Sequence, residues 1–131
     1  MYPLGTLLVE DADMDALLTT RAIKAIPQLK LLWRARSGEE ALCYLNGQLP
    51  FSNRDQFPYP ELIILDLLME GVDGLAVLKA IHDLPIRPKT LVFSHRADSA
   101  AIQACYDLGA DAFYAKTEDL SRVLTSLGWL K

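Results

Sequence analysis

The chain has 131 residues, the usual length of one domain, and a globular chain of this length buries roughly two thirds of the surface that its unfolded form exposes. The composition is 51% hydrophobic and 23% charged, with 7 glycines and 7 prolines, which excludes a disordered, collagen-like or low-complexity protein. The net charge of −4 and the pI near 5.1 argue against nucleic acid as a partner and favour metal cations.

Cysteine usage and the first residues predict a cytoplasmic protein. Cys43 and Cys105 lie far apart and outside any CxxC pattern, so we expect two buried thiols rather than a disulfide or a zinc site. The opening residues, MYPLGTLLVEDADMD, lack the features of a signal peptide, and no apolar run approaches the about 18 residues of a membrane span. We therefore expect a single domain over residues 1–131 that binds neither a membrane nor nucleic acid.

Short apolar runs alternate with amphipathic stretches along the whole chain. The predicted strands are residues 4–9, 29–35, 61–65, 90–93 and 112–115. Amphipathic helices are predicted between them, the first following Asp13 as a possible N-cap and the last following Thr117. The apolar stripe predicted for the first helix is Met14, Leu17, Leu18, Ala22, Ala25 and Ile26. Five such units predict an α/β fold with a parallel sheet covered on both faces.

Residues 46–60, NGQLPFSNRDQFPYP, form a predicted loop that is longer than the ~4–6 residues typical of compact domains. It contains three prolines and the aromatic residues Phe51, Phe57 and Tyr59. Those aromatic side chains either fold back onto the domain or form a contact surface, and the sequence leaves both possibilities open.

Polar side chains follow four of the five predicted strands. Glu10 and Asp11 follow the first strand, Asp66 the third, Ser94 the fourth and Lys116 the fifth. In open parallel sheets, ligands bind beyond the carboxyl ends of the strands. We therefore expect three carboxylates, a hydroxyl and an ammonium group to meet at one edge of the sheet.

Such a group of carboxylates needs positive charge, because each pair of like charges 4 Å apart costs about 4 kcal/mol at an effective dielectric of about 20. Lys116 supplies one positive charge, and a hard divalent cation such as Mg²⁺ (or Mn²⁺) would supply the rest. A carboxylate nucleophile, a divalent cation, an ammonium group and a hydroxyl are the groups needed for phosphoryl transfer to aspartate.

The segments LLVEDADMD, LIILDLLMEGVDG, VFSH and DAFYAK, in this order and spacing, resemble the receiver domain of two-component response regulators. The resemblance covers nearly the whole chain and is to chemotaxis-type, stand-alone receivers. It implies a flavodoxin-like (βα)5 fold with strand order 2-1-3-4-5. The long loop is similar to that of some single-domain receivers, including those paired with bacterial phytochromes.

The resemblance also assigns the metal and acceptor residues. It implies that Asp66 accepts the phosphoryl group and that Glu10 and Asp11 are the acidic pair that positions Mg²⁺. It further implies that the backbone carbonyl of Leu68 is a metal ligand.

Four further residues take roles from the same resemblance. Lys116 matches the lysine that contacts the phosphoryl group, Ser94 the switch hydroxyl and Phe113 the mobile aromatic residue. Phosphorylation is then expected to draw Ser94 toward the site and to turn Phe113 inward. Leu68 and His95 occupy positions that flank the path of the attacking water, so they are expected to modulate the lifetime of the phosphoryl group.

Two positions depart from the family pattern. The chain has Met69-Glu70 where Met-Pro is common, which removes a rigid turn and adds a charge near the site. It has Lys116-Thr117 where Lys-Pro is common, often with a cis bond. A cis bond costs ~2.5–4 kcal/mol before a residue other than proline, so we expect a trans peptide here.

The expected function is therefore that of a receiver that takes a phosphoryl group from a histidine kinase or a phosphotransfer protein. It would catalyse its own phosphorylation and dephosphorylation without being a turnover enzyme. Its output would be a protein contact through the face of the fourth helix, fifth strand and fifth helix, with a homodimer as one possibility.

Three alternatives remain open. A phosphatase of the haloacid dehalogenase type needs a second acid two residues after the nucleophile, where this chain has Leu68. A flavodoxin needs a loop rich in hydroxyl groups and glycine after the first strand, where this chain has EDADMD. A degenerate receiver would act only as a docking or dimerisation module, and the retention of Asp66 and Lys116 argues against it.

Overall fold

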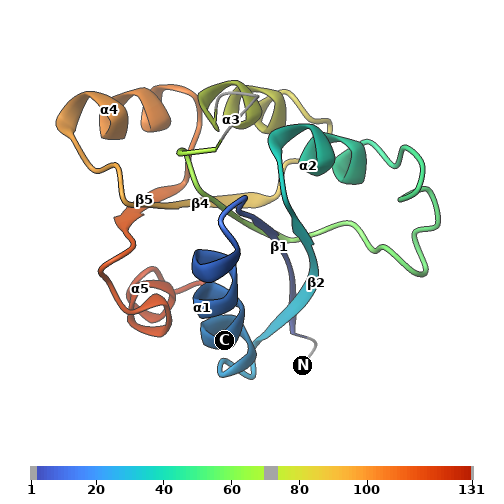
Figure 1. Ribbon diagram of the computed structural model, residues 1–131, viewed down its shortest axis with the longest axis horizontal. Helices are drawn as coiled ribbons and strands as arrows, with labels where there is room; N and C mark the ends of the chain where they lie inside the picture. Colours follow the sequence, from blue (N-terminus) through green and yellow to red (C-terminus); the bar gives the residue numbers. More distant parts are fainter. Residues whose placement is uncertain (1–2, 70–73, 131) are drawn as a thin grey trace.

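The computed structural model describes residues 3–69 and 74–130, which form five strands and five helices in alternation (Figure 1). The strands are β1 (Leu4–Val9), β2 (Leu29–Ala35), β3 (Leu62–Leu65), β4 (Lys89–Ser94) and β5 (Ala112–Ala115). The helices are α1 (Asp13–Lys24), α2 (Gly38–Leu45), α3 (Gly74–His82), α4 (Ser99–Asp107) and α5 (Leu120–Ser126). Every strand pair is parallel and the order is β2-β1-β3-β4-β5, which confirms the flavodoxin-like fold.

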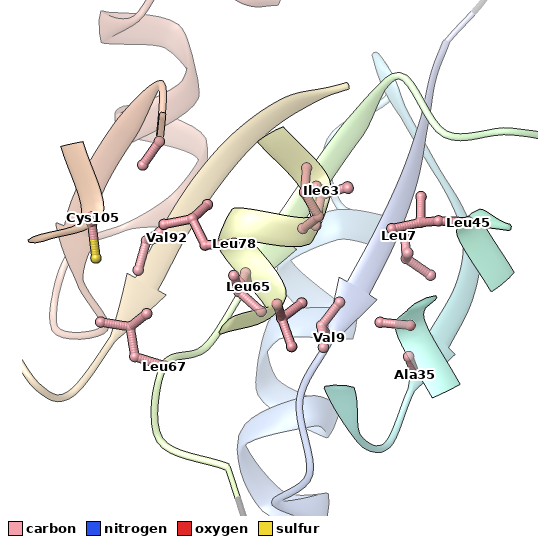
Figure 2. Packing of buried hydrophobic residues seen from close by; sticks show 14 of the residues in the cluster. Leu7, Val9, Ala35, Leu45, Ile63, Leu65, Leu67, Leu78, Val92 and Cys105 are labelled. Atoms are coloured by element: carbon pink, nitrogen blue, oxygen red, sulfur yellow. The ribbon is translucent and has the colours of Figure 1, made fainter. Parts of the chain in front are cut away.

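The sheet is the middle of three layers, with α2, α3 and α4 on one face and α1 and α5 on the other (Figure 1). Alternate residues of a strand point to opposite faces, so each central strand contributes to two cores. On β1, Leu7 and Val9 pack under α2 and α3 (Figure 2), while Leu8 packs against the other face. On β3, Ile63 and Ile64 divide in the same way. Burial on both faces explains why these strands are almost continuously apolar.

The buried face of α1 differs from the predicted stripe. Ala16, Thr19 and Ile23 are buried, whereas Met14, Leu17 and Leu18 are 67%, 45% and 55% exposed. Ile26 of the predicted stripe is buried as expected, but the prediction was wrong for Met14, Leu17 and Leu18, because the buried face of α1 itself runs through Ala16, Thr19 and Ile23.

The helix ends also differ in two places. α1 begins at Asp13 itself, and its N-cap residue is Ala12 rather than Asp13. The N-cap of α5 is Asp119, whose carboxylate accepts hydrogen bonds from the backbone N–H groups of Ser121 and Arg122. Thr117 is therefore not the cap, because a second side chain suited to capping follows it two residues later.

The loop between α2 and β3 folds back onto the domain. Phe51 is buried and its ring centroid lies 5.4 Å from that of Trp33 and 5.2 Å from that of Phe57. The Tyr44 hydroxyl donates to the Pro58 carbonyl at 2.7 Å, and Arg54 donates to three backbone carbonyls at 2.9–3.2 Å. Of the two possibilities left open by the sequence, these aromatic side chains therefore fold back and pack against the domain.

The Lys116–Thr117 peptide is trans, as expected, since the cis bond of the described chain is Leu49–Pro50. Glu70, expected to add a charge near the site, lies outside the described residues. Of the helices that the structure describes, none combines the length and the apolar character needed to cross a membrane.

Candidate functional site

Backbone hydrogen bonds that extend the sheet hold the polar residues at the carboxyl ends of the strands. The N–H group of Glu10 donates to Ala35 at 3.0 Å, and that of Asp66 donates to Val9 at 3.1 Å. The N–H group of Lys116 donates to the Ser94 carbonyl at 3.0 Å. Each side chain thus starts from a rigid position on a neighbouring strand, which is the arrangement expected for a preorganised site.

The ammonium group of Lys116 is the centre of the site. Its Nζ donates to Asp66 Oδ2 at 2.9 Å, to Asp15 Oδ2 at 3.0 Å and to Glu10 Oε1. The side chains of Glu10, Asp66 and Lys116 are only 1%, 5% and 6% exposed. Of the five residues predicted to meet at one edge of the sheet, Glu10 and Asp66 contact Lys116 directly.

Burial strongly perturbs the charges of this cluster. Burial, assisted by the nearby charge of Asp66, raises the pKa of the Glu10 carboxyl to about 7 in spite of its hydrogen bond to Lys116. Burial by itself would lower the pKa of Lys116, but its hydrogen bonds to the carboxylates outweigh burial and raise the pKa above its usual range. Lys116 is therefore a permanent cation, while Glu10 can change its protonation near neutral pH.

The site offers the oxygen ligands that a hard divalent cation prefers. Oxygens of Glu10, Asp15 and Asp66 lie within 4.8 Å of one another. Asp11 follows Glu10 and is partly buried, and within the described residues it is not in this convergent group. The Leu68 N–H group donates to Asp66 Oδ1 at 3.1 Å, which holds the backbone of Leu68 against the site. Carboxylates with a nearby backbone carbonyl fit Mg²⁺ or Mn²⁺.

The expected switch residues are both buried. Ser94 is 0% exposed, and its Oγ accepts a hydrogen bond from the Arg96 N–H at 3.1 Å. Phe113 is 9% exposed and belongs to the core on the α3 and α4 side of the sheet. Its N–H group donates to the Tyr106 hydroxyl of α4 at 3.1 Å. The ring of Phe113 is already buried in the core. This structure therefore does not show the outward-facing ring from which the expected inward turn would begin.

His95 and Asp15 form the rim of the site. His95 is 57% exposed, and its Nε2 lies 3.4 Å from Asp15 Oδ2, the same oxygen that contacts Lys116. Our sequence reading missed Asp15, because it lies in the first turn of α1 rather than at a strand end. The spacing of EDADMD, which places an acid five residues after Glu10, is the signal that was available.

The chain belongs to the response regulator receiver domain family, whose model matches residues 6–127. Response regulator Rcp1 of Synechocystis is 32% identical over 122 residues, which cover 90% of this chain and 80% of Rcp1. The transcriptional regulatory proteins LiaR of Bacillus subtilis and DcuR of Escherichia coli are 25% and 27% identical. The chain covers 53% and 50% of their lengths, so about half of each lies outside the match.

Solved structures give the same family. The Mn²⁺-bound form of Rcp1 superposes with a TM-score of 0.78 and 27% identity, covering 98% of this chain and 96% of that one. The phosphorylated cyanobacterial phytochrome response regulator RcpA has a TM-score of 0.80 and 28% identity, with 95% and 89% covered. The bacteriophytochrome response regulator AtBRR has a TM-score of 0.79 and 30% identity, with 99% and 94% covered. This chain is thus a response regulator receiver domain of a two-component system, with a flavodoxin-like fold.

Proposed function

We propose that this receiver accepts a phosphoryl group on Asp66 from a histidine kinase or a phosphotransfer protein. The observation that carries the proposal is the hydrogen bond between Asp66 Oδ2 and the buried ammonium group of Lys116. Phosphorylated RcpA, which has the same fold, supports the proposal. Because relatives of the same fold are response regulators of phytochromes, a phytochrome kinase is the first donor to test.

Asp66, Lys116 and Ser94 each have a role in this reaction. An Asp66 oxygen attacks phosphorus, and the bond from phosphorus to the donor breaks while the donor keeps the bonding pair. Lys116 offsets the negative charge of the transferred oxygens. Ser94 supplies a hydroxyl on the neighbouring strand that can donate to the same oxygens.

A divalent cation completes the proposed site. Glu10, Asp11 and Asp66, with the Leu68 carbonyl, would hold Mg²⁺ or Mn²⁺, and the bound cation would neutralise charge on the phosphoryl oxygens. The convergence of Glu10 and Asp66 oxygens within 4.8 Å supports this proposal, as does the Mn²⁺ bound to Rcp1.

The remaining parts of the proposal concern partners and place. The protein would transfer the phosphoryl group to itself and lose it to water, without being a turnover enzyme for a separate substrate. Its output would be a protein contact, or a homodimer contact, through α4, β5 and α5. It would act in the cytoplasm, where the free thiols of Cys43 and Cys105 stay reduced.

The test is incubation with Mg²⁺ and acetyl phosphate, followed by intact mass measurement. We expect the unchanged protein to gain the mass of one phosphoryl group and Asp66→Asn to gain none, because the amide is nearly isosteric but is not a carboxylate nucleophile. The matched control is Asp83→Asn, at the exposed residue that follows α3, which should be phosphorylated normally. A phosphoryl group on the Asp66→Asn variant would overturn the proposal.

A further inference from the structure

Asp15 is a third carboxylate on Lys116, and the proposed reaction gives it no task. It comes from the first turn of α1, whereas its two companions, Glu10 and Asp66, follow strands of the sheet. The side chain of Asp15 is 28% exposed, against 1% for Glu10 and 5% for Asp66. Asp15 is therefore the one partner of Lys116 that water reaches easily.

The hydrogen-bonding capacity of Lys116 is fully used in this structure. An ammonium group has three N–H donors, and Lys116 directs them to Glu10, Asp15 and Asp66. The phosphoryl group of a donor held in front of Asp66 brings new anionic oxygens that also need a cationic donor while Asp66 is still a carboxylate. Lys116 can serve them only by releasing one of the carboxylates that it now holds.

The cost of release differs among the three carboxylates. The carboxylates of Glu10 and Asp66 are 1% and 5% exposed, so water cannot easily take the place of Lys116 at either of them. Releasing Asp15 costs less, because water and the ring of His95, whose Nε2 is 3.4 Å from Asp15 Oδ2, remain as partners. Asp15 is thus the partner that Lys116 gives up.

Asp15 also lies on the solvent-exposed side of Lys116. It lines a depression of about 450 Å³ on the surface together with His95 and Lys116. Its hydrogen bond to Lys116 lowers the pKa of Asp15, so this carboxylate is negatively charged at neutral pH. A negative charge at the rim repels an approaching anion more strongly when that anion carries more charge.

We propose that Asp15 is a positioning residue that occupies Lys116 in the unphosphorylated protein and biases the site against highly anionic small phosphodonors. The inference rests on the proposed function, since it takes Asp66 as the acceptor. It predicts that removing the charge of Asp15 frees Lys116 and admits such donors more readily.

Two small phosphodonors of different net charge distinguish an electrostatic role of Asp15 from a structural role. With acetyl phosphate, which is doubly negative, a bond forms between an Asp66 oxygen and phosphorus, and acetate leaves with the electron pair of the broken P–O bond. With phosphoramidate, whose nitrogen is protonated near neutral pH, the P–N bond breaks and ammonia leaves with the bonding pair and its three hydrogens. The phosphoramidate carries less net negative charge past Asp15.

The experiment compares Asp15→Asn with the unchanged protein in saturating Mg²⁺, with each donor at several concentrations and intact mass as the readout. The phosphorylation rate with acetyl phosphate is expected to rise about three- to tenfold, and the rate with phosphoramidate to rise less, so that the ratio of the two rates increases. Added salt should reduce the difference between the two proteins. The matched control is Asp13→Asn on the same turn, whose carboxylate contacts Arg34 and Arg36 instead, and it should leave the ratio unchanged.

The possible outcomes are distinct. An unchanged ratio, or an equal loss of rate with both donors, would mean that Asp15 acts only structurally and would overturn the inference while Asp66 remains the acceptor. An equal rise of the rate ratio in Asp13→Asn would mean that only the overall charge of the protein matters, and it would also overturn the inference. Phosphorylation of Asp66→Asn, or no phosphorylation of the unchanged protein, would overturn the proposed function and the inference with it.

Discussion

At the scale of single residues, the site contains more carboxyl groups than its one ammonium group can neutralise. Lys116 faces Glu10, Asp15 and Asp66, so one positive charge meets three carboxyl groups. Burial raises the pKa of Glu10, whose carboxyl group is the most deeply buried of the three. Its protonation is therefore the most direct measure of the electrostatics of the metal-free site.

We expect the metal-free protein to lose stability as the pH rises from 5 to 8. The pKa of Glu10 is about 7 in the folded protein and near its ordinary 4.5 when unfolded, so the folded state binds this proton more tightly. The stabilisation is full below the unfolded pKa and is lost as the pH rises through the folded pKa. Glu10→Gln should remove a pH-dependent part of the free energy of unfolding on the order of 1–3 kcal/mol.

Urea denaturation in the presence of a chelator, at several pH values, measures this quantity. Glu39→Gln, at the start of α2, is the matched control and should keep the pH dependence of the unchanged protein. The same slope between pH 5 and 8 in Glu10→Gln and in the unchanged protein would contradict the shifted pKa.

Leu68 and His95 should control how long the phosphoryl group survives. Leu68 is 51% exposed next to Asp66, and its side chain offers no hydrogen bond to orient a water molecule. His95 covers the rim of the site beside Asp15. Leu68→Asn combined with His95→Ala should therefore speed the loss of the phosphoryl group by about tenfold, which is less than the ~10²–10⁴-fold that a positioned acid or base contributes. Decay would be followed by intact mass after removal of the donor. Leu49→Asn with His82→Ala, two exposed residues elsewhere, is the control, and equal or slower decay in the site variant would refute this role.

At the scale of elements, the strands were easier to predict than the helices and the loop. Short runs rich in apolar residues mark the strands clearly, and the bounds of β1, β2 and β5 agree with the predicted ranges. The side-chain face of α1 was not predictable in the same way, because Met14, Leu17 and Leu18 fit a helical stripe as well as the residues that are actually buried.

The site shows the same division. Glu10, Asp66 and Lys116 could be predicted to meet because strand ends share one edge of a parallel sheet. Asp15 could not, because its position depends on how α1 is rotated about its axis. The buried face runs through Ala16, Thr19 and Ile23, which form a weaker apolar pattern than Met14, Leu17 and Leu18 beside them.

The loop of residues 46–60 should behave as part of the core rather than as a flexible connection. Phe51 is 3% exposed and packs against Trp33, Tyr44 and Phe57. Phe51→Ala should lower the free energy of unfolding by about 3–5 kcal/mol, as expected for a buried phenylalanine.

Denaturant unfolding of this variant would be compared with Leu49→Ala, a control in the same loop whose side chain is 82% exposed. The control should cost less than about 0.5 kcal/mol, as surface substitutions usually do. Equal small effects of both substitutions would show that the loop packs only loosely.

At the scale of the whole molecule, the sheet brings together residues that lie far apart along the chain. Lys116 contacts Glu10 across 106 positions and Asp66 across 50 positions. The two cores hold the strands in register, and the strand ends carry the reacting groups. Stability and chemistry are thus divided between the middle and the carboxyl edge of one sheet.

The most direct test of the account locates the phosphoryl group. After phosphorylation in Mg²⁺, borohydride reduction converts an aspartyl phosphate to homoserine, and peptide mass spectrometry then identifies the changed residue. If Asp66 is the phosphoacceptor, we expect homoserine at position 66 and an unchanged aspartate at positions 11 and 15. Reduction at either of those two positions with Asp66 intact, or a phosphoryl group on His95, would contradict this assignment.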